Sequence, residues 1–286
     1  MFDRNLISNK YLYPNDYLDS FKVNFLNAKP FPSIVIKDFF EDSFLSKVLE
    51  DFPDLEKIES SQKYNNQNEF KFASNDYNNF PNSIKKLVDF LNSKSFLNFI
   101  QKVTSIEEKL ISDEELNGGG LHEIKQGGVL KIHTDFNKHP NNNLDRRVNL
   151  LLYLNKNWKD SYGGFLELWD KNMKNCFNKI KPEFNTMVIF NTNDYSNHGH
   201  PDPLNCPLDR SRKSIATYYF SDGRPSYEID DAKFKNKTYF KSRDGIANDA
   251  EIDNQVFKNF LRKQKIYQLI KKLEKKFLRR NKKKIK

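Results

Sequence analysis

The sequence predicts a mainly β protein with flanking α-helices, built around an antiparallel barrel or jelly roll. Between residues 118 and 220, short strand-like runs are divided by Gly, Asn and Pro, which is typical of many short strands joined by loops. Before residue 118, apolar side chains recur at helical spacing, as in helices that pack on a sheet. Aromatic residues make up 14% of the chain. Disordered chains lack such side chains, so we exclude that class.

The N-terminal part begins with an irregular lead-in, because the first 30 residues have scattered aromatic side chains without a period. Residues 33–36 predict a short β-branched strand. An amphipathic helix follows, with Asp42 or Ser43 as its N-cap and Pro53 at its end. We expect this helix to lie on the sheet.

Residues 56–79 are polar and rich in asparagine, so we predict a long loop that borders a substrate site. Two further amphipathic helices open at Ser83 and Ser95. Strands are predicted at residues 129–135, 148–155, 165–169, 186–190 and 214–220. The run 148–155 is almost continuously apolar, which is expected for a strand buried on both faces.

The number of cysteines and the lengths of the apolar runs indicate the cellular compartment in which the protein works. The two cysteines, Cys176 and Cys206, are too few for a disulfide scaffold or a thiolate metal site, which fits a reducing compartment. No apolar run suits a signal peptide, and no window approaches the roughly 18 apolar residues of a membrane span. We therefore expect a cytoplasmic protein without a transmembrane segment.

The basic charge gathers at the C-terminal end. Residues 255–286 hold 14 Lys and Arg against one acid, Glu274, so this tail has a net charge of 14 − 1 = +13. Because the whole chain has a formal net charge of +10, residues 1–254 have a net charge of 10 − 13 = −3. Apolar residues recur there at helical spacing, which predicts one or two basic amphipathic helices. Such a tail can contact an anionic surface, nucleic acid or an acidic partner, or pack its apolar face on the protein; composition does not choose.

The triplet His133-Thr134-Asp135 is the centre of the predicted site. Residues two apart in a strand share a face, so the imidazole and the carboxylate can reach one point in space. A second histidine would complete a 2-His-1-carboxylate triad, the ligand set of non-haem Fe(II). His198 and His200 lie downstream and share a face if the segment is extended. Zinc accepts the same donors, so a zinc hydrolase is the alternative.

Six motifs follow one another in this region. They are HTDFN (133–137), RRVNLLLYLN (146–155), GGFLELW (163–169), the strand at 185–190, SNHGHPDPL (196–204) and RKSIATYYF (212–220). In this order they resemble the Fe(II)- and 2-oxoglutarate-dependent dioxygenases, and within them the prolyl-4-hydroxylase-like branch. The resemblance implies a double-stranded β-helix, a cupin-like jelly roll with supporting helices. The implied organisation is a lead-in at 1–30, a dioxygenase domain at 31–225 with its core at 121–220, a polar link at 226–252 and a basic helical tail at 253–286.

The resemblance also implies a catalytic metal site. His133, Asp135 and His198 match the family's ligand positions, and the family pattern favours His198 over His200. The implied cofactors and cosubstrates are Fe(II), 2-oxoglutarate and O2, with ascorbate as an optional addition. Halogenating relatives lack the carboxylate ligand, so Asp135 points to hydroxylation or another oxygenase outcome. A hydroxylase of this family couples hydroxylation of an unactivated C–H bond to decarboxylation of 2-oxoglutarate to succinate and CO2.

The far carboxylate of 2-oxoglutarate needs a cation. Arg212 matches the family's basic residue at the head of the last strand, and a guanidinium binds a carboxylate through two parallel hydrogen bonds. Arg210 competes for this role but stands outside the matching motif. Tyr153 matches a tyrosine that helps to hold the same carboxylate in the family, and it also suits the core. His122 and His139 are expected in loops or behind the ligands.

The resemblance identifies the oxidant and leaves the substrate open among a peptidyl proline, a small molecule and a sugar. We expect substrate choice in the loops 64–79, 137–146 and 201–210. A zinc hydrolase gives no role to Arg212. The rival from another class is a catalytically idle jelly roll that acts as an adaptor through its basic tail, and the intact set of four site residues speaks against it.

Overall fold

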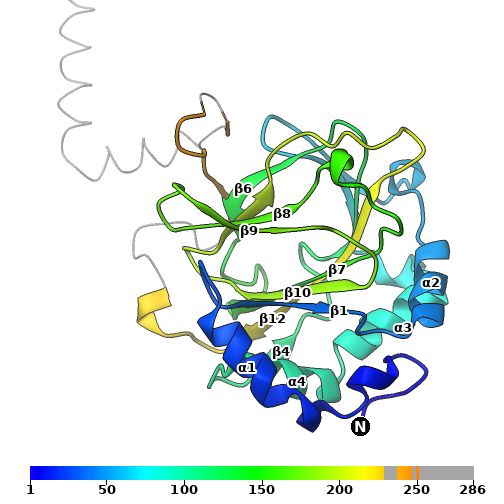
Figure 1. The fold of residues 1–286 in the computed structure, drawn as a ribbon, viewed down its shortest axis with the longest axis vertical. Coiled ribbons are helices and arrows are strands. Elements are labelled where there is room, and N and C mark those ends of the chain that lie inside the picture. Colours follow the sequence, from blue (N-terminus) through cyan, green and yellow to red (C-terminus); the bar gives the residue numbers. More distant parts are fainter. Residues whose placement is uncertain (229–236, 247–248, 251–286) are drawn as a thin grey trace, which may run out of the picture. The chain divides into compact units, whose positions relative to one another are not determined.

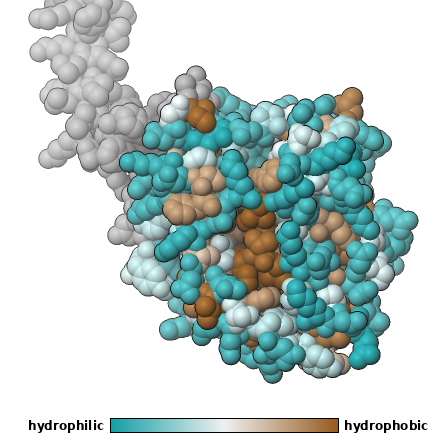
Figure 2. Space-filling model, in the orientation of Figure 1, coloured by the Kyte–Doolittle hydropathy of each residue, from teal (hydrophilic) through white to brown (hydrophobic). Residues whose placement is uncertain are grey.

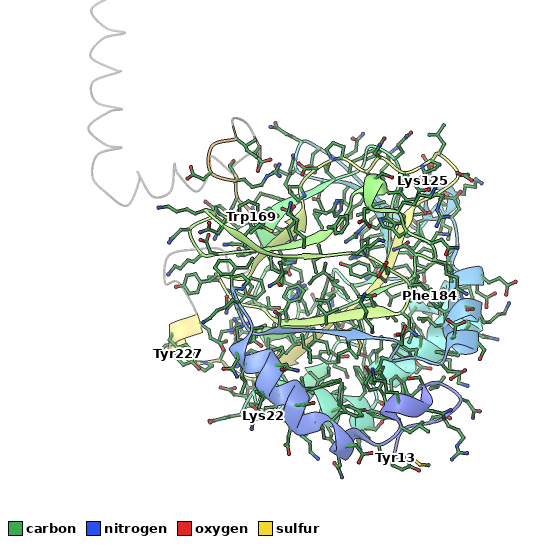
Figure 3. All side chains as sticks on the ribbon, in the orientation of Figure 1. Tyr13, Lys22, Lys125, Trp169, Phe184 and Tyr227 are labelled. Atoms are coloured by element: carbon green, nitrogen blue, oxygen red, sulfur yellow. The ribbon has the colours of Figure 1, made fainter. Side chains whose placement is uncertain are left out.

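Two β-sheets form the centre of the structure, a computed structural model that describes residues 1–228, 237–246 and 249–250. In Figure 1 the smaller sheet, with β6, β8 and β9, lies above the larger one, with β7, β10 and β12. Side chains of both sheets fill the space between them (Figure 3). The prediction of a mainly β protein with flanking helices is confirmed for the described part of the chain.

Strand pairing within both sheets is antiparallel throughout the described residues. The larger sheet has the order β1-β10-β7-β12-β5-β3-β2, with β4 paired to β12. Its strands are β1 (Ser33–Lys37), β2 (Gln62–Asn65), β3 (Phe70–Ser74), β4 (Ile111–Ser112), β5 (Gly120–Ile124), β7 (Asp145–Tyr153), β10 (Thr186–Asn191) and β12 (Arg212–Ser221). The smaller sheet has the order β13-β6-β11-β8-β9. Its strands are β6 (Leu130–Thr134), β8 (Leu166–Trp169), β9 (Cys176–Ile180), β11 (Asn197–His200) and β13 (Tyr239–Phe240).

β7 is an inner strand of the larger sheet, between β10 and β12. Leu150 and Leu152 belong to the large apolar core, whereas Tyr153 belongs to a second cluster with Leu166 and Leu168 of the smaller sheet. The strand is therefore buried on both faces, as its apolar run predicts. Figure 2 shows the face of Figure 1 as largely hydrophilic, with an apolar band in its middle where β9 lies above β10.

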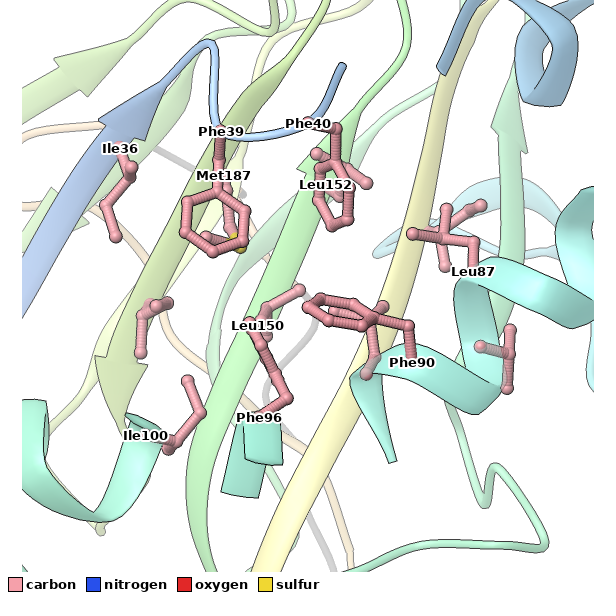
Figure 4. Packing of buried hydrophobic residues seen from close by; sticks show 14 of the residues in the cluster. Ile36, Phe39, Phe40, Leu87, Phe90, Phe96, Ile100, Leu150, Leu152 and Met187 are labelled. Carbon is pink, nitrogen blue, oxygen red and sulfur yellow. The ribbon is translucent and has the colours of Figure 1, made fainter. Parts of the chain in front are cut away.

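Helices supply the other half of the large core. In the described residues the α-helices are α1 (Leu18–Asn27), α2 (Asp42–Glu50), α3 (Asn82–Leu91) and α4 (Lys94–Thr104). Figure 4 shows Phe90 and Phe96 of α3 and α4 beside Leu150 and Leu152 of β7. Burying an aromatic side chain of this size contributes roughly 2–3 kcal/mol relative to leaving it exposed. The Ser93 hydroxyl caps α4 by accepting the N–H of Phe96 at 3.3 Å.

The helix starts differ from the predicted ones: α3 begins at Asn82 and α4 at Lys94, one residue before the predicted Ser83 and Ser95. The lead-in, predicted as irregular, contains α1, whose exposed Val23 and Leu26 blur the apolar period. Helix α2 already begins at Asp42, so Asp42 and Ser43 lie inside it, and Glu41 at the N-cap makes no side-chain capping bond. Packing of the apolar face, rather than a cap, therefore stabilises the start of this helix.

The polar stretch 56–79, predicted as a long loop, contains the hairpin of β2 and β3. β3 pairs with β5, with Phe72 opposite Glu123. The pairing partner is about fifty residues away in sequence, so local composition carried no sign of it. The hairpin extends the larger sheet beside the cavity described below.

The predicted polar link, 226–252, also holds a strand. β13 pairs with β6, with Tyr239 opposite Thr134 and Phe240 opposite His133. The predicted basic helical tail, 253–286, lies outside the described residues. In the part of the chain that the structure describes, no helix has both the length and the apolar character needed to cross a membrane.

Candidate functional site

Three metal-donor side chains meet where β6 and β11 pair. The antiparallel register places His198 directly opposite His133, and Asp135 follows the last residue of β6. One donor atom of each residue lies within 4.8 Å of the other two. The Nε2 atom of His133 is 3.5 Å from one oxygen of Asp135, and the Nε2 atom of His198 is 3.4 Å from the other.

Backbone carbonyls set the orientation of both imidazoles. The Nδ1 atom of His133 lies 2.8 Å from the carbonyl oxygen of Lys131, and the Nδ1 atom of His198 lies 2.9 Å from that of Ser196. A carbonyl oxygen only accepts, so each Nδ1 carries the proton and each Nε2 keeps its lone pair. Two lone pairs and a carboxylate then face one another, and a divalent cation fits this donor set.

Asp135 is held by two side chains of β7. Its Oδ2 atom accepts from Arg146 Nη2 at 3.1 Å and from Asn149 Nδ2 at 2.5 Å, and Arg146 Nε donates to Asn149 Oδ1 at 2.8 Å. Burial alone would raise the pKa of Asp135, but the charge of Arg146, together with the adjacent rings of His198 and His133, outweighs it and holds this pKa well below its usual range. The carboxylate is therefore ready to bind a cation at neutral pH.

Arg146 is a buried cation that the sequence analysis did not single out. It is 1% exposed, and its guanidinium lies 3.3 Å from the ring centre of Tyr218 and 4.5 Å from that of Phe136. Its position at the start of a largely apolar strand could have indicated its role from the sequence. An arginine is rarely buried in such a strand unless an acidic partner accompanies it. The partner here is Asp135.

We predict that Arg146→Met lowers iron affinity about tenfold, because residues that orient a metal ligand typically contribute 10- to 100-fold. A chelator competition on the purified variant measures the change. Arg147→Met is the matched control: Arg147 is equally buried on the same strand, but it pairs with Glu108 and Glu228 away from the site. Equal iron affinity in both variants would contradict a positioning role for Arg146.

Arg212 lies buried at the head of β12, at 5% exposure. Its Nη2 donates to the Tyr153 hydroxyl at 3.0 Å, and its Nε donates to the carbonyl oxygen of Gly164 at 2.8 Å. A Cβ at Gly164 would lie 3.0 Å from the Cδ of Arg212, so glycine permits this close approach. No carboxylate among the described residues pairs with the guanidinium, and a buried cation without a counter-ion favours an anionic ligand.

A cavity of about 170 Å³ joins the two groups of residues. His133, Asp135 and His198 line it at one part and Arg212 at another. Further lining side chains are Lys71, His122, His200, Ser214 and Thr238. Burial, with help from nearby Lys71, lowers the pKa of His122 to about 3, so its ring is neutral.

The other predicted residues fall in different places. The structure brings His198 and not His200 into the three-donor group. Arg210 donates to the backbone oxygen of Lys156 at an exposed position and does not line the cavity. His139 is buried and does not line the cavity, and its Nε2 lies 3.1 Å from the side-chain nitrogen of Asn117.

The three stretches expected to read the substrate contribute unequally to the cavity. The hairpin contributes Tyr64, Glu69 and Lys71, of which the last two form an ion pair, and Arg146 ends the second stretch, 137–146. No residue of the third stretch, 201–210, lines the cavity. Thr238, next to β13, could not have been found from the sequence, because its place depends on pairing with β6 across about a hundred residues.

The fold and site define a class of metal-dependent oxygenases, and the comparison with known families agrees. Residues 119–220 match the 2OG-Fe(II) oxygenase superfamily. This segment is that of a 2OG-Fe(II) oxygenase, and it contains the three-donor group. Its cofactors are Fe(II) and 2-oxoglutarate, as the superfamily and the His-Asp-His group imply. No curated protein matches the sequence.

Several solved structures share the fold at low sequence identity. A prolyl hydroxylase from Trichoplax adhaerens, in complex with a hypoxia inducible factor oxygen degradation domain peptide fragment, is 19% identical with a TM-score of 0.55, over 77% of this chain and 96% of that chain. A prolyl-4-hydroxylase from Pseudomonas putida is 12% identical with a TM-score of 0.50, over 74% and 100%. The non-heme α-ketoglutarate-dependent carbocyclase SnoK from nogalamycin biosynthesis is 9% identical with a TM-score of 0.50, over 78% and 87%.

Proposed function

We propose that this protein hydroxylates an unactivated C–H bond, with His133, Asp135 and His198 as the ligands of Fe(II). The observation that carries the proposal is one cavity that joins these three donors to the buried guanidinium of Arg212, which has no carboxylate partner among the described residues. A zinc hydrolase would leave this cation without a role.

The main residues of the cavity have the following roles in this proposal. Fe(II), 2-oxoglutarate and O2, when bound, would supply the oxidant: one oxygen atom of O2 enters the C–H bond as C–OH and the other enters succinate as 2-oxoglutarate loses CO2. The two imidazoles and Asp135 hold the metal, while Arg212 and Tyr153 hold the far carboxylate. Apolar side chains such as Leu151 and Leu166 line the same cavity and exclude water.

The dioxygenase domain in this proposal is 31–225, with its core at 121–220. We take a prolyl residue as the first substrate class to test, because two of the similar solved structures are prolyl hydroxylases. A small molecule or a sugar is the alternative, and SnoK shares the fold as an enzyme named a carbocyclase. Product analysis by mass spectrometry with proline-containing peptides distinguishes these classes.

An anaerobic titration tests the oxidant independently of the substrate. We predict that purified protein with Fe(II) and 2-oxoglutarate develops the visible charge-transfer band of a chelated keto acid, because the three ligands leave metal positions open for it. Succinate in place of 2-oxoglutarate, and Zn(II) in place of Fe(II), are the controls and should give no band. Folded wild-type protein without the band would overturn the proposal and favour the idle adaptor.

A further inference from the structure

His200 is a buried imidazole without a hydrogen-bond partner among the described residues. It is 2% exposed, and neither Nδ1 nor Nε2 has a partner. Each of the other histidines has at least one. The partners are Gly118 for His122, Lys131 for His133, Asn117 and Asn141 for His139, and Ser196 for His198. An unpartnered buried polar ring indicates a group that the protein part of the structure does not contain.

The position of His200 indicates where that group lies. His200 stands two residues after His198 on β11, and both line the cavity that Arg212 also lines. The ring therefore borders the same cavity as the three-donor group and the buried guanidinium. A ligand that reaches from the metal to Arg212 would share this cavity with His200.

We propose that His200 donates a hydrogen bond to the same 2-oxoglutarate carboxylate that Arg212 binds. The assignment rests on the proposed function and adds a residue to it. It makes His200 a recognition residue for the distal carboxylate, so the cavity selects 2-oxo acids that carry a second acidic group.

The donors that remain in the cavity support this role. Within the described residues Arg212 uses its Nε–H for Gly164 and one N–H of Nη2 for Tyr153, which leaves the other N–H of Nη2 and both of Nη1 for a ligand. A neutral imidazole has one N–H, and a carboxylate can accept several hydrogen bonds. One carboxylate can thus satisfy both Arg212 and His200, and a hydrogen bond to an ionised acceptor is stronger than a neutral one.

Three variants separate the donor from the space that it fills. His200→Phe keeps a planar ring without a donor, His200→Val removes both, and His200→Gln retains an N–H. Iron retention is measured by chelator competition, folding by thermal unfolding, and affinity by anaerobic titration of the charge-transfer band. Each titration is repeated with 2-oxopentanoate, which has the keto acid but lacks the distal carboxylate.

We expect His200→Phe and His200→Val to retain iron and to bind 2-oxoglutarate about tenfold more weakly, which is the size of one charge-assisted hydrogen bond. His200→Gln should recover most of the affinity. The affinity for 2-oxopentanoate should be the same in wild type and in all three variants, because the distal carboxylate is already absent.

Other results would overturn the assignment. Loss of iron in the variants would make His200 a metal ligand, and unchanged 2-oxoglutarate affinity in both donor-free variants would leave it a space-filling residue. An equal loss for both keto acids would place the contact at the metal-binding end. If wild type itself gives no band with 2-oxoglutarate, the proposed function fails first. If wild type gives the band and the donor-free variants bind 2-oxoglutarate with unchanged affinity, only the role of His200 is refuted and the proposed function stands.

Discussion

Asp135→Ala is expected to abolish iron retention and to reduce turnover of 2-oxoglutarate roughly a thousandfold or more, since a catalytic metal contributes several kcal/mol. The change removes the one anionic donor from the three-donor group and leaves two neutral imidazoles. It also strands Arg146, whose carboxylate partner it was. Metal content after desalting and succinate production measure the two effects, and His133→Ala should behave in the same way.

Loss of stability must be separated from loss of the ligand, because removing one partner of a buried ion pair leaves the other uncompensated. Asp113→Ala is a matched control: Asp113 is a buried carboxylate 3.6 Å from the Nε2 of His139, and it does not line the cavity. Asp135→Asn adds a variant of the same shape without the charge. If Asp135→Ala and Asp113→Ala hold equal amounts of iron, the ligand assignment is wrong.

The parts of the site that the sequence predicted are those that follow local rules. His133 and Asp135 share a face because a strand has a period of two, and the long apolar run predicts the inner position of β7. Arg212 and Tyr153 were expected near one carboxylate from a resemblance of motifs, and their side chains lie 3.0 Å apart. Their binding roles stay predictions.

The parts that escaped the sequence depend on contacts between distant segments. Arg146 and Asn149 were visible as residues, but only the pairing of strands around the site brings them to Asp135. The hairpin of β2 and β3 is polar, and its pairing with β5 overrides its loop-like composition. Thr238 reaches the cavity through the pairing of β13 with β6. No local period encodes these three placements.

Arg212→Met is expected to retain iron and to weaken 2-oxoglutarate binding about a hundredfold. Two hydrogen bonds to an ionised group contribute about 3 kcal/mol or more together, and each 1.4 kcal/mol is a factor of ten. Anaerobic titration of the charge-transfer band measures the affinity. Arg210→Met is the matched control, because Arg210 lies two residues away, is more exposed and does not line the cavity; its guanidinium donates to the backbone of Lys156 and lies over the ring of Tyr162.

Thermal unfolding tests independently whether the charge of Arg212 binds 2-oxoglutarate. In the ligand-free protein, Arg212 is a desolvated cation without a carboxylate partner in the described residues, so its replacement by Met should cost little stability or even raise it. In wild type, saturating 2-oxoglutarate with Mn(II), which does not turn over, should raise the unfolding temperature through binding to the native state alone. Because the variant binds about a hundredfold more weakly, that rise should be clearly smaller in Arg212→Met at the same 2-oxoglutarate concentration and should keep its full size in Arg210→Met. If it keeps its full size in Arg212→Met as well, another cation of the cavity, such as Lys71, binds the carboxylate, and the role assigned to Arg212 is wrong.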